Sequence, residues 1–143
     1  MIARFLLYVL GLCLTACPAV AEQDSSTSLK TIMQGLRNDT VLIMDALLME
    51  DFAAVADAAV RISDHPRIPP EQVSLVAAEL GPEMPAFKQF DTLVHDLAVS
   101  LREAADEGDR IRVQRTFQDM VAGCFGCHAV YRQRVMSVLA EGD

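Results

Sequence analysis

Two cysteines and a histidine stand close together near the C-terminal end of the chain, in the run Cys124-Phe125-Gly126-Cys127-His128. Two thiols three positions apart, with an imidazole directly after the second, are typical of the covalent attachment of a c-type haem. Each thiol can add to one vinyl group of the porphyrin, and the imidazole can then bind the iron from the same side. Within a helix these three side chains fall within about one turn. We expect Gly126 to leave room for the ring near the backbone.

A redox dithiol and a zinc site are the alternatives for this motif. A redox dithiol is expected where a strand leads into a helix N-terminus, which lowers the pKa of the thiol. This motif lies instead inside a long helical pattern. Structural zinc needs four ligands, whereas Cys124 and Cys127 are the only cysteines outside the N-terminal leader and the histidines are scattered. The pattern therefore favours haem attachment.

The composition fits a single acidic domain. The 143 residues carry 12 Lys and Arg against 20 Asp and Glu, a formal net charge of −8. The remaining cysteines, Cys13 and Cys17, lie in the leader, so a disulfide framework is excluded. The acidic balance disfavours nucleic acid as a partner, and it favours redox partner proteins with a basic docking surface.

Residues 1–21 have the pattern of a secretory signal peptide. Arg4 precedes an apolar run over 5–12 that is too short to span a bilayer. We expect cleavage at the A-x-A site of residues 19–21, which leaves 22–143 as the mature domain. The alternative is a lipobox that ends at Cys17, which would then be acylated and would hold the protein at a membrane surface. Both alternatives imply export to the bacterial periplasm.

Apolar residues at three- and four-residue spacing predict four long helices over 29–49, 52–63, 86–107 and 110–140. A short helix is expected at 70–80, within the longest connection. Short connections before the second and fourth of the long helices predict an all-α fold, an antiparallel four-helix bundle. In the last helix, five residues lie within about 40° of His128 at 100° per residue, so the haem-binding side chains are expected to face the core. These are Phe117, Val121, Cys124, Val135 and Leu139.

A haem motif on the last helix of such a bundle resembles the class II c-type cytochromes, namely cytochrome c prime and its low-spin, methionine-ligated relatives. The resemblance covers about residues 29–140, and the run from Cys124 to Arg132 is its most specific part. Class I cytochromes carry the motif near the N-terminus instead. The resemblance implies that His128 is the proximal iron ligand. It also implies that Tyr131 and Arg132 lie beside the proximal face of the haem.

The same resemblance puts the distal residue in the first turns of the first helix, where Met33 matches best. A methionine there binds iron or packs near it, whereas leucine or phenylalanine leaves the sixth site open. Leu36 and Met44 are the nearby rivals. Cytochrome c prime often has an arginine four residues earlier that contacts a propionate, and here that position is Leu29, with Lys30 as a weak substitute. His95 and His65 are expected in solvent and in a loop, not on iron.

These expectations lead to a main functional hypothesis and two alternatives. The main one is a periplasmic electron carrier with iron bound by His128 and Met33. The second is a five-coordinate cytochrome c prime that binds nitric oxide or carbon monoxide. The third is a haem-containing subunit or anchored module, if Cys17 is lipidated. No acid–base pair, nucleophile or phosphate loop accompanies the motif, so no substrate-converting enzyme is expected. Dimers built on the first two helices occur in the family, so a homodimer is a further alternative.

Overall fold

The computed structural model describes residues 28–140, and every regular element in that range is helical. The leader with its two candidate cleavage sites lies outside the described residues. The elements are α1 (Leu29–Leu48), α2 (Phe52–Ser63), α3 (Pro70–Leu80), the 3-10 turn η1 (Gly81–Glu83), α4 (Met84–Asp106) and α5 (Arg110–Ala140). The predicted all-α fold is confirmed. The predicted helix bounds agree with the structure to within two residues.

Local chemistry explains where the helices begin and end. Asp51 and Asp109 cap α2 and α5, since their side chains accept hydrogen bonds from the backbone N–H of Ala54 and of Arg112, each at 3.0 Å. Gly108 has a φ of 68° between α4 and α5, a conformation that residues with a side chain rarely adopt. These signals depend only on residues a few positions apart in the sequence.

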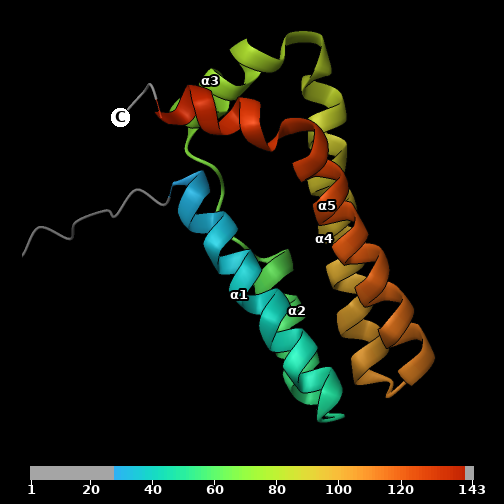
Figure 1. Cartoon of the computed structure of the whole chain (residues 1–143). Coiled ribbons are helices and arrows are strands. Elements are labelled where there is room, and N and C mark those ends of the chain that lie inside the picture. The colour runs from blue at the N-terminus through green and yellow to red at the C-terminus, as the bar shows by residue number, and fades with distance from the viewer. Residues whose placement is uncertain (1–27, 141–143) are drawn as a thin grey trace, which may run out of the picture.

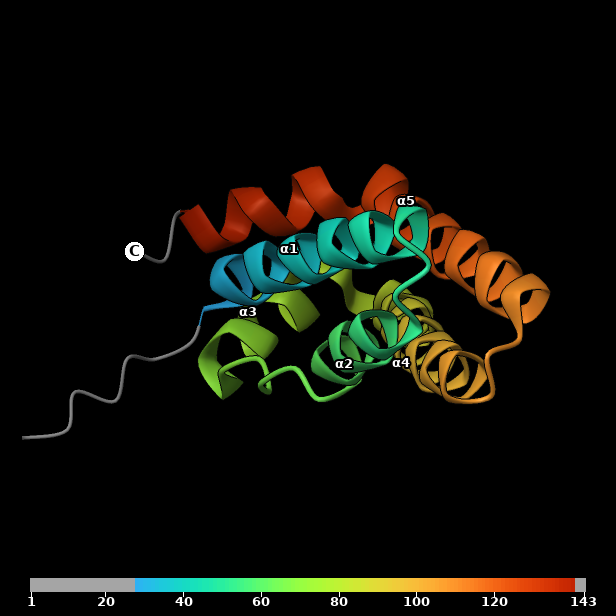
Figure 2. The ribbon, with the colours of Figure 1, turned by 90° about the horizontal axis from the view of Figure 1, so that it is seen from below.

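The four long helices form two antiparallel hairpins, one of α1 and α2 and one of α4 and α5 (Figure 1). The helix α2 packs extensively on α4 and joins the hairpins. By contrast, α1 and α5 are not among the helix pairs with extensive contacts. Viewed from below, α5 runs past the α1–α2 hairpin along one side of the molecule (Figure 2). The bundle thus has one open edge, between α1 and α5.

The buried side chains form two separate clusters. The larger cluster, which we call the closed-end core, lies where the α1–α2 and α4–α5 turns meet, and it includes Ile43, Ile62, Leu101, Val113 and Met120. The smaller cluster, the motif-end core, lies at the other end. It joins α3 to the second half of α5 and to the first residue of α1, and its buried members are Leu29, Val76, Leu80, Tyr131 and Val135. No buried residue belongs to both clusters.

The two hairpin turns at the closed end are linked by a contact across the bundle. The guanidinium of Arg110 donates a hydrogen bond to the carboxylate of Glu50. The same guanidinium lies 5.7 Å from the ring centroid of Phe52, within cation–π range. Glu50 has a φ of 56°, so its backbone holds a conformation that is uncommon for a residue with a side chain. The contact therefore links the turn between α1 and α2 to the start of α5.

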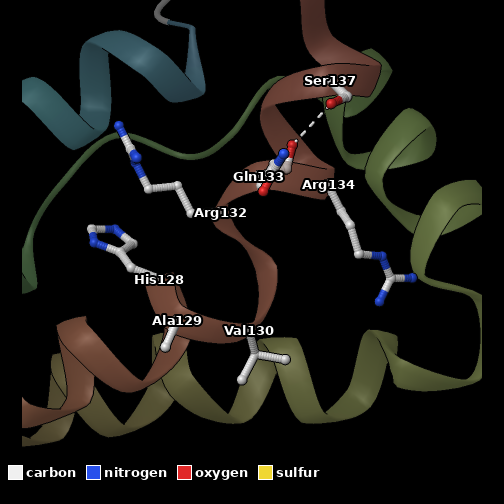
Figure 3. A pocket seen from close by; sticks show the side chains of 7 residues that line it. All are labelled: His128, Ala129, Val130, Arg132, Gln133, Arg134 and Ser137. Atoms are coloured by element: carbon white, nitrogen blue, oxygen red, sulfur yellow. Dashed lines mark hydrogen bonds between the residues drawn. The ribbon is translucent and has the colours of Figure 1, made fainter.

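At the other end α5 bends, and its last part runs across the top of the molecule in Figure 1. The bend lies between Val130 and Gln133 (Figure 3). Beyond it, Arg134 donates to Glu79 Oε1 at 3.0 Å and to Glu83 Oε1 at 2.8 Å. These ion pairs hold the α3–η1 segment against the end of α5. None of the helices within residues 28–140 is long and apolar enough to cross a membrane.

Candidate haem-binding site

The two motif cysteines are free thiols, and both are half-buried. Burial raises the pKa of the Cys124 thiol. Burial also raises the pKa of Cys127 to about 11, with smaller contributions from Cys124 and the carboxylate of Asp91. A redox dithiol requires the opposite shift, because the thiolate is its reactive form. Within residues 28–140 no group of three or more His, Cys, Asp or Glu side chains is arranged to hold a metal ion. The raised pKa values of the thiols disfavour a redox dithiol.

His128 is exposed, and this corrects the expectation that all the haem-binding side chains face the core, whereas Cys124 and Cys127 are half-buried. The buried residues of α5 centre on a direction about 70° from His128 at 100° per residue. Cys127 lies on the buried side and packs against the motif-end core. The sequence pattern was misleading because apolar residues line both flanks of His128, and only the packing on α4 and α3 decides which flank is buried.

Seven residues of α5 around the bend line an open recess of about 580 Å³. In Figure 3 the side chains of His128 and Arg132 extend to the side of α5 on which α1 lies, whereas Arg134 extends toward the α3–η1 segment. Arg132 is exposed and makes no ion pair with any residue of the described range. An imidazole and a free guanidinium therefore border the open edge of the bundle together. The lining residues are His128, Ala129, Val130, Arg132, Gln133, Arg134 and Ser137.

Gly126 has a different role from the one expected. A Cβ at this position would lie 2.9 Å from Cε1 of Phe90, and one at Gly123 would lie 3.2 Å from Cγ2 of Val94. Both glycines thus face α4, on the side of α5 away from His128. Their lack of a side chain lets α4 and α5 approach closely, and it does not open space for a ring.

Tyr131 and Arg132, which the resemblance puts together beside the haem, point to different surroundings. Tyr131 is 4% exposed, and its ring meets those of Phe87 and Phe90 edge to face at centroid distances of 5.5 and 6.2 Å. It therefore packs into the motif-end core against α4. Arg132 lies about 100° around the helix from Tyr131 and is exposed to solvent. In this structure the tyrosine supports the helix that carries the motif, and the arginine borders the open edge.

The candidate distal residues lie on α1. Met33 is 38% exposed, and Met44, three turns later on the same flank, is 48% exposed. Leu36 is half-buried and packs against the closed-end core. Leu29 is buried, and its N–H donates to Gln72 Oε1 at 2.8 Å, so the start of α1 is held by α3. Met33 is thus the methionine nearer the motif end of α1.

The other two histidines lie outside the motif. His95 is exposed, and its Nδ1 lies 3.1 Å from the carboxylate of its neighbour Asp96, which agrees with the expected solvated position. His65 lies in the connection after α2, as expected, but is half-buried. Its Nδ1 is 2.8 Å from the carbonyl of Pro66, and its Nε2 is 3.6 Å from Asp91. The interactions of Asp91 and Arg134 were not foreseen, because both join segments far apart in the sequence.

The residues present fit a covalently bound haem. Two free thiols and an imidazole lie on adjacent faces of one helix, next to an edge of the bundle that no helix pair closes. The facing flank of α1 offers partly exposed apolar side chains, among them Met33. A large apolar ring bound there would bury this surface, and thioether bonds to Cys124 and Cys127 would hold the ring against α5.

Comparison with known proteins gives a partial match. No family model matches the sequence, and no solved structure matches it. Cytochrome c' of Alcaligenes xylosoxydans xylosoxydans is 36% identical over 56 residues, which are 39% of this chain and 44% of that protein. The matched part is thus less than half of either chain. Together with the helical bundle, this match relates the chain to cytochrome c', a haem-binding cytochrome.

Proposed function

We propose that the protein is an exported c-type cytochrome that carries single electrons between proteins of the bacterial periplasm and converts no substrate. In this proposal Cys124 and Cys127 hold the haem through thioether bonds, and His128 binds the iron. Haem iron supplies one-electron chemistry, with a potential set by its axial ligands and surroundings. The observation that carries the proposal is the position of the motif on α5, beside the bundle edge where α1 and α5 do not pack together.

The surroundings of the motif support this role. Covalent bonds from two thiols keep the cofactor on the protein through repeated brief encounters with partners. The motif-end core packs against Cys127, and the Arg134 ion pairs hold the end of α5 against α3 and η1. A site built on a helix that is held in this way keeps its geometry when the charge at the iron changes.

The proposal has two versions, which differ in what occupies the sixth coordination position of the iron. Met33 is partly exposed near the start of α1, one of the two helices that border the open edge, and its flexible thioether is a candidate iron ligand. Ligation by Met33 gives a low-spin electron carrier. Gas binding at an open sixth position is the second candidate. The partial exposure of Met33 favours it, because the closed-end core does not hold that side chain in a fixed position.

The first experiment tests covalent attachment. The protein is produced in a bacterium that matures c-type cytochromes, and it is then denatured and extracted with acidified organic solvent. We expect haem to stay with the chain, and Cys124→Ala together with Cys127→Ala to remove it. His95→Ala is the control for His128→Ala, and only the His128 change should alter the optical spectrum. Extraction of free haem from the wild-type protein would refute the proposal.

The second experiment tests the sixth ligand with a matched pair of variants on α1. Met33→Ala should convert a low-spin spectrum with a sulfur-to-iron band into that of a protein that binds carbon monoxide readily, and it should lower the potential. Met44→Ala removes the same side chain from the same flank and should leave the spectrum unchanged. A wild-type protein that is high-spin and insensitive to both changes would instead support gas binding.

A third experiment addresses export. The intact mass of protein purified from the periplasm should correspond to a chain that begins at Glu22. A diacylglycerol-modified Cys17 would place the protein on a membrane surface instead, as an anchored module.

A further inference from the structure

The charges of the described residues are unevenly distributed between α5 and the rest. Residues 28–109 contain six Lys and Arg but fifteen Asp and Glu, whereas α5 contains five arginines and a single aspartate. The helix that carries the motif is therefore basic within an acidic protein. Three of these arginines pair with carboxylates of other elements, so the positive charge that a partner can meet comes from Arg115 and Arg132.

The outer face of α5 presents a continuous exposed stripe with one carboxylate, that of Asp119, at its margin. Its members recur at three- and four-residue spacing, so they share one side of the helix. Phe125 is 71% exposed and Ile111 is 60% exposed, while Asp119 borders the stripe four residues after Arg115. We call this set the outer stripe, and it consists of Ile111, Gln114, Arg115, Gln118, Ala122, Phe125 and Ala129, all of them exposed.

The arginines of α5 differ in whether carboxylates of α4 and of the hairpin turns pair with them. Arg110 pairs with Glu50, and Arg112 pairs with Glu103 and Glu107. Arg115 makes no ion pair with any residue between 28 and 140. The positive charge of the outer stripe is therefore available to a partner, and Arg132 adds a second unpaired guanidinium at the motif end of α5.

Phe125 connects the outer stripe to the cofactor site, because it stands between Cys124 and Cys127 in the motif. At 100° per residue the stripe is centred about 90° from His128, on the side away from Cys127. A ring held by the two cysteines and His128 thus leaves the stripe uncovered, yet Phe125 lies within one helical turn of both thiols. A partner seated on Phe125 is close to the haem.

We propose that the outer stripe is the docking surface for an acidic partner protein, with Phe125 as the apolar centre and Arg115 as its basic rim. This inference rests on the proposed electron transfer. An exposed aromatic ring surrounded by small and polar side chains resembles the centre of a transient interface. Charge complementarity chiefly raises the association rate of such a pair. The net charge of the chain alone would favour the opposite, a basic partner.

Hexacyanoferrate(III), a small multiply charged anion, tests the local charge because it takes one electron from the ferrous protein. We expect its reaction rate to fall as salt is added, although the protein is net negative. Arg115→Glu should lower the rate at low salt by about 3–10-fold. Lys88→Glu makes the same charge change on an exposed residue two positions from Phe90, hence on the side of α4 away from α5, and should have little effect.

Equal effects of Arg115→Glu and Lys88→Glu would overturn the inference, since only net charge would then matter. A rate that rises with salt in the wild-type protein would also overturn it. These results leave the proposed electron transfer intact, because the haem still reacts. A covalent haem that exchanges no electron with hexacyanoferrate, or no covalent haem, refutes the proposed function and this inference with it.

Synthetic peptides test the apolar centre. A glutamate-rich peptide with a central pair of leucines should bind the haem protein about 10-fold or more tightly than an all-glutamate peptide of equal length. Phe125→Ser should remove this difference, and Ile111→Ser should reduce it less. If both variants still bind the leucine-containing peptide as tightly as the wild-type protein does, the assignment is wrong. Stronger, Arg115-dependent binding to phosphatidylglycerol vesicles than to either peptide would overturn it in favour of a lipid surface.

Discussion

The two ends of the bundle are built in contrasting ways. At the closed end, alanines that are fully buried, such as Ala58, Ala59 and Ala98, let the helices approach closely, and large side chains such as Leu101 fill the remaining space. At the motif end, His128 is exposed, Cys124 and Cys127 are half-buried, and Met33 is partly exposed. Packing is complete where no cofactor is expected and incomplete where one is.

In the proposed cytochrome, this contrast would assign stability and cofactor binding to different residues. The closed-end core draws on all four long helices, so it can hold the two hairpins together without haem. The motif-end core depends on α3, an element outside the bundle, and on the far part of α5. Substitutions at the closed end should therefore change the free energy of unfolding, and substitutions at the motif end should mainly change local structure.

The largest effect on stability is expected from the closed-end core. Leu101 is fully buried, and Leu101→Ala should lower the free energy of unfolding by about 2–5 kcal/mol, because it leaves a cavity among three helices. Urea denaturation followed by circular dichroism measures this change. Leu75→Ala removes the same atoms from a residue that is 41% exposed and should shift the value by less than about 0.5 kcal/mol. Similar losses for both would remove the contrast between core and surface.

A smaller loss is expected where α4 and α5 touch beside the motif. Gly126→Ala puts a Cβ 2.9 Å from Phe90 and should lower the free energy of unfolding by about 1–3 kcal/mol through overpacking. Gly35→Ala meets nothing within 4 Å and should raise it by about 0.5–1 kcal/mol, because alanine favours the helix. Phe90→Leu should partly restore the Gly126→Ala protein. The decisive result is that the two substitutions change the free energy of unfolding in opposite directions.

A local effect is expected from the ion pairs between α5 and α3. Arg134→Gln removes the pairs with Glu79 and Glu83, which are partly exposed to solvent, so the loss should be about 0.2–1 kcal/mol and should shrink in high salt. Amide hydrogen exchange should quicken in α3 and leave α2 unchanged. Arg102→Gln, which breaks a pair within α4, should not alter exchange in α3.

The last effect on stability appears only at high pH, and it comes from the thiols of the haem-free protein. Because the pKa of Cys127 is raised to about 11 from an ordinary value near 8.5, the folded state favours the protonated thiol. Its stability relative to the unfolded chain should therefore fall as the pH rises from about 9 through 11. Iodoacetamide should react slowly at pH 8 with the folded protein and faster after urea is added. Rapid alkylation of the folded protein at pH 8 would indicate a redox dithiol.

The sequence predicted the helices well because their signals are local. Proline at Pro70 and the caps at Asp51 and Asp109 depend on residues a few positions away, and the structure has helix starts at or beside each of them. The roles of Gly126 and Tyr131 could not be read in this way, since both depend on which face of α5 meets Phe90. Arg134 gave no local signal at all. Iron ligation by His128 and Met33 stays a prediction.

The separation of the buried residues into two clusters has a consequence for how the holoprotein is made. Because the clusters share helices but no buried residue, the motif end can open as a local unfolding unit while the closed end stays folded. If the protein is the proposed cytochrome, such an opening would expose the half-buried Cys127 to the enzymes that form thioether bonds without unfolding the whole domain. The less densely packed end would then admit the cofactor during assembly, and the bound cofactor would complete its core.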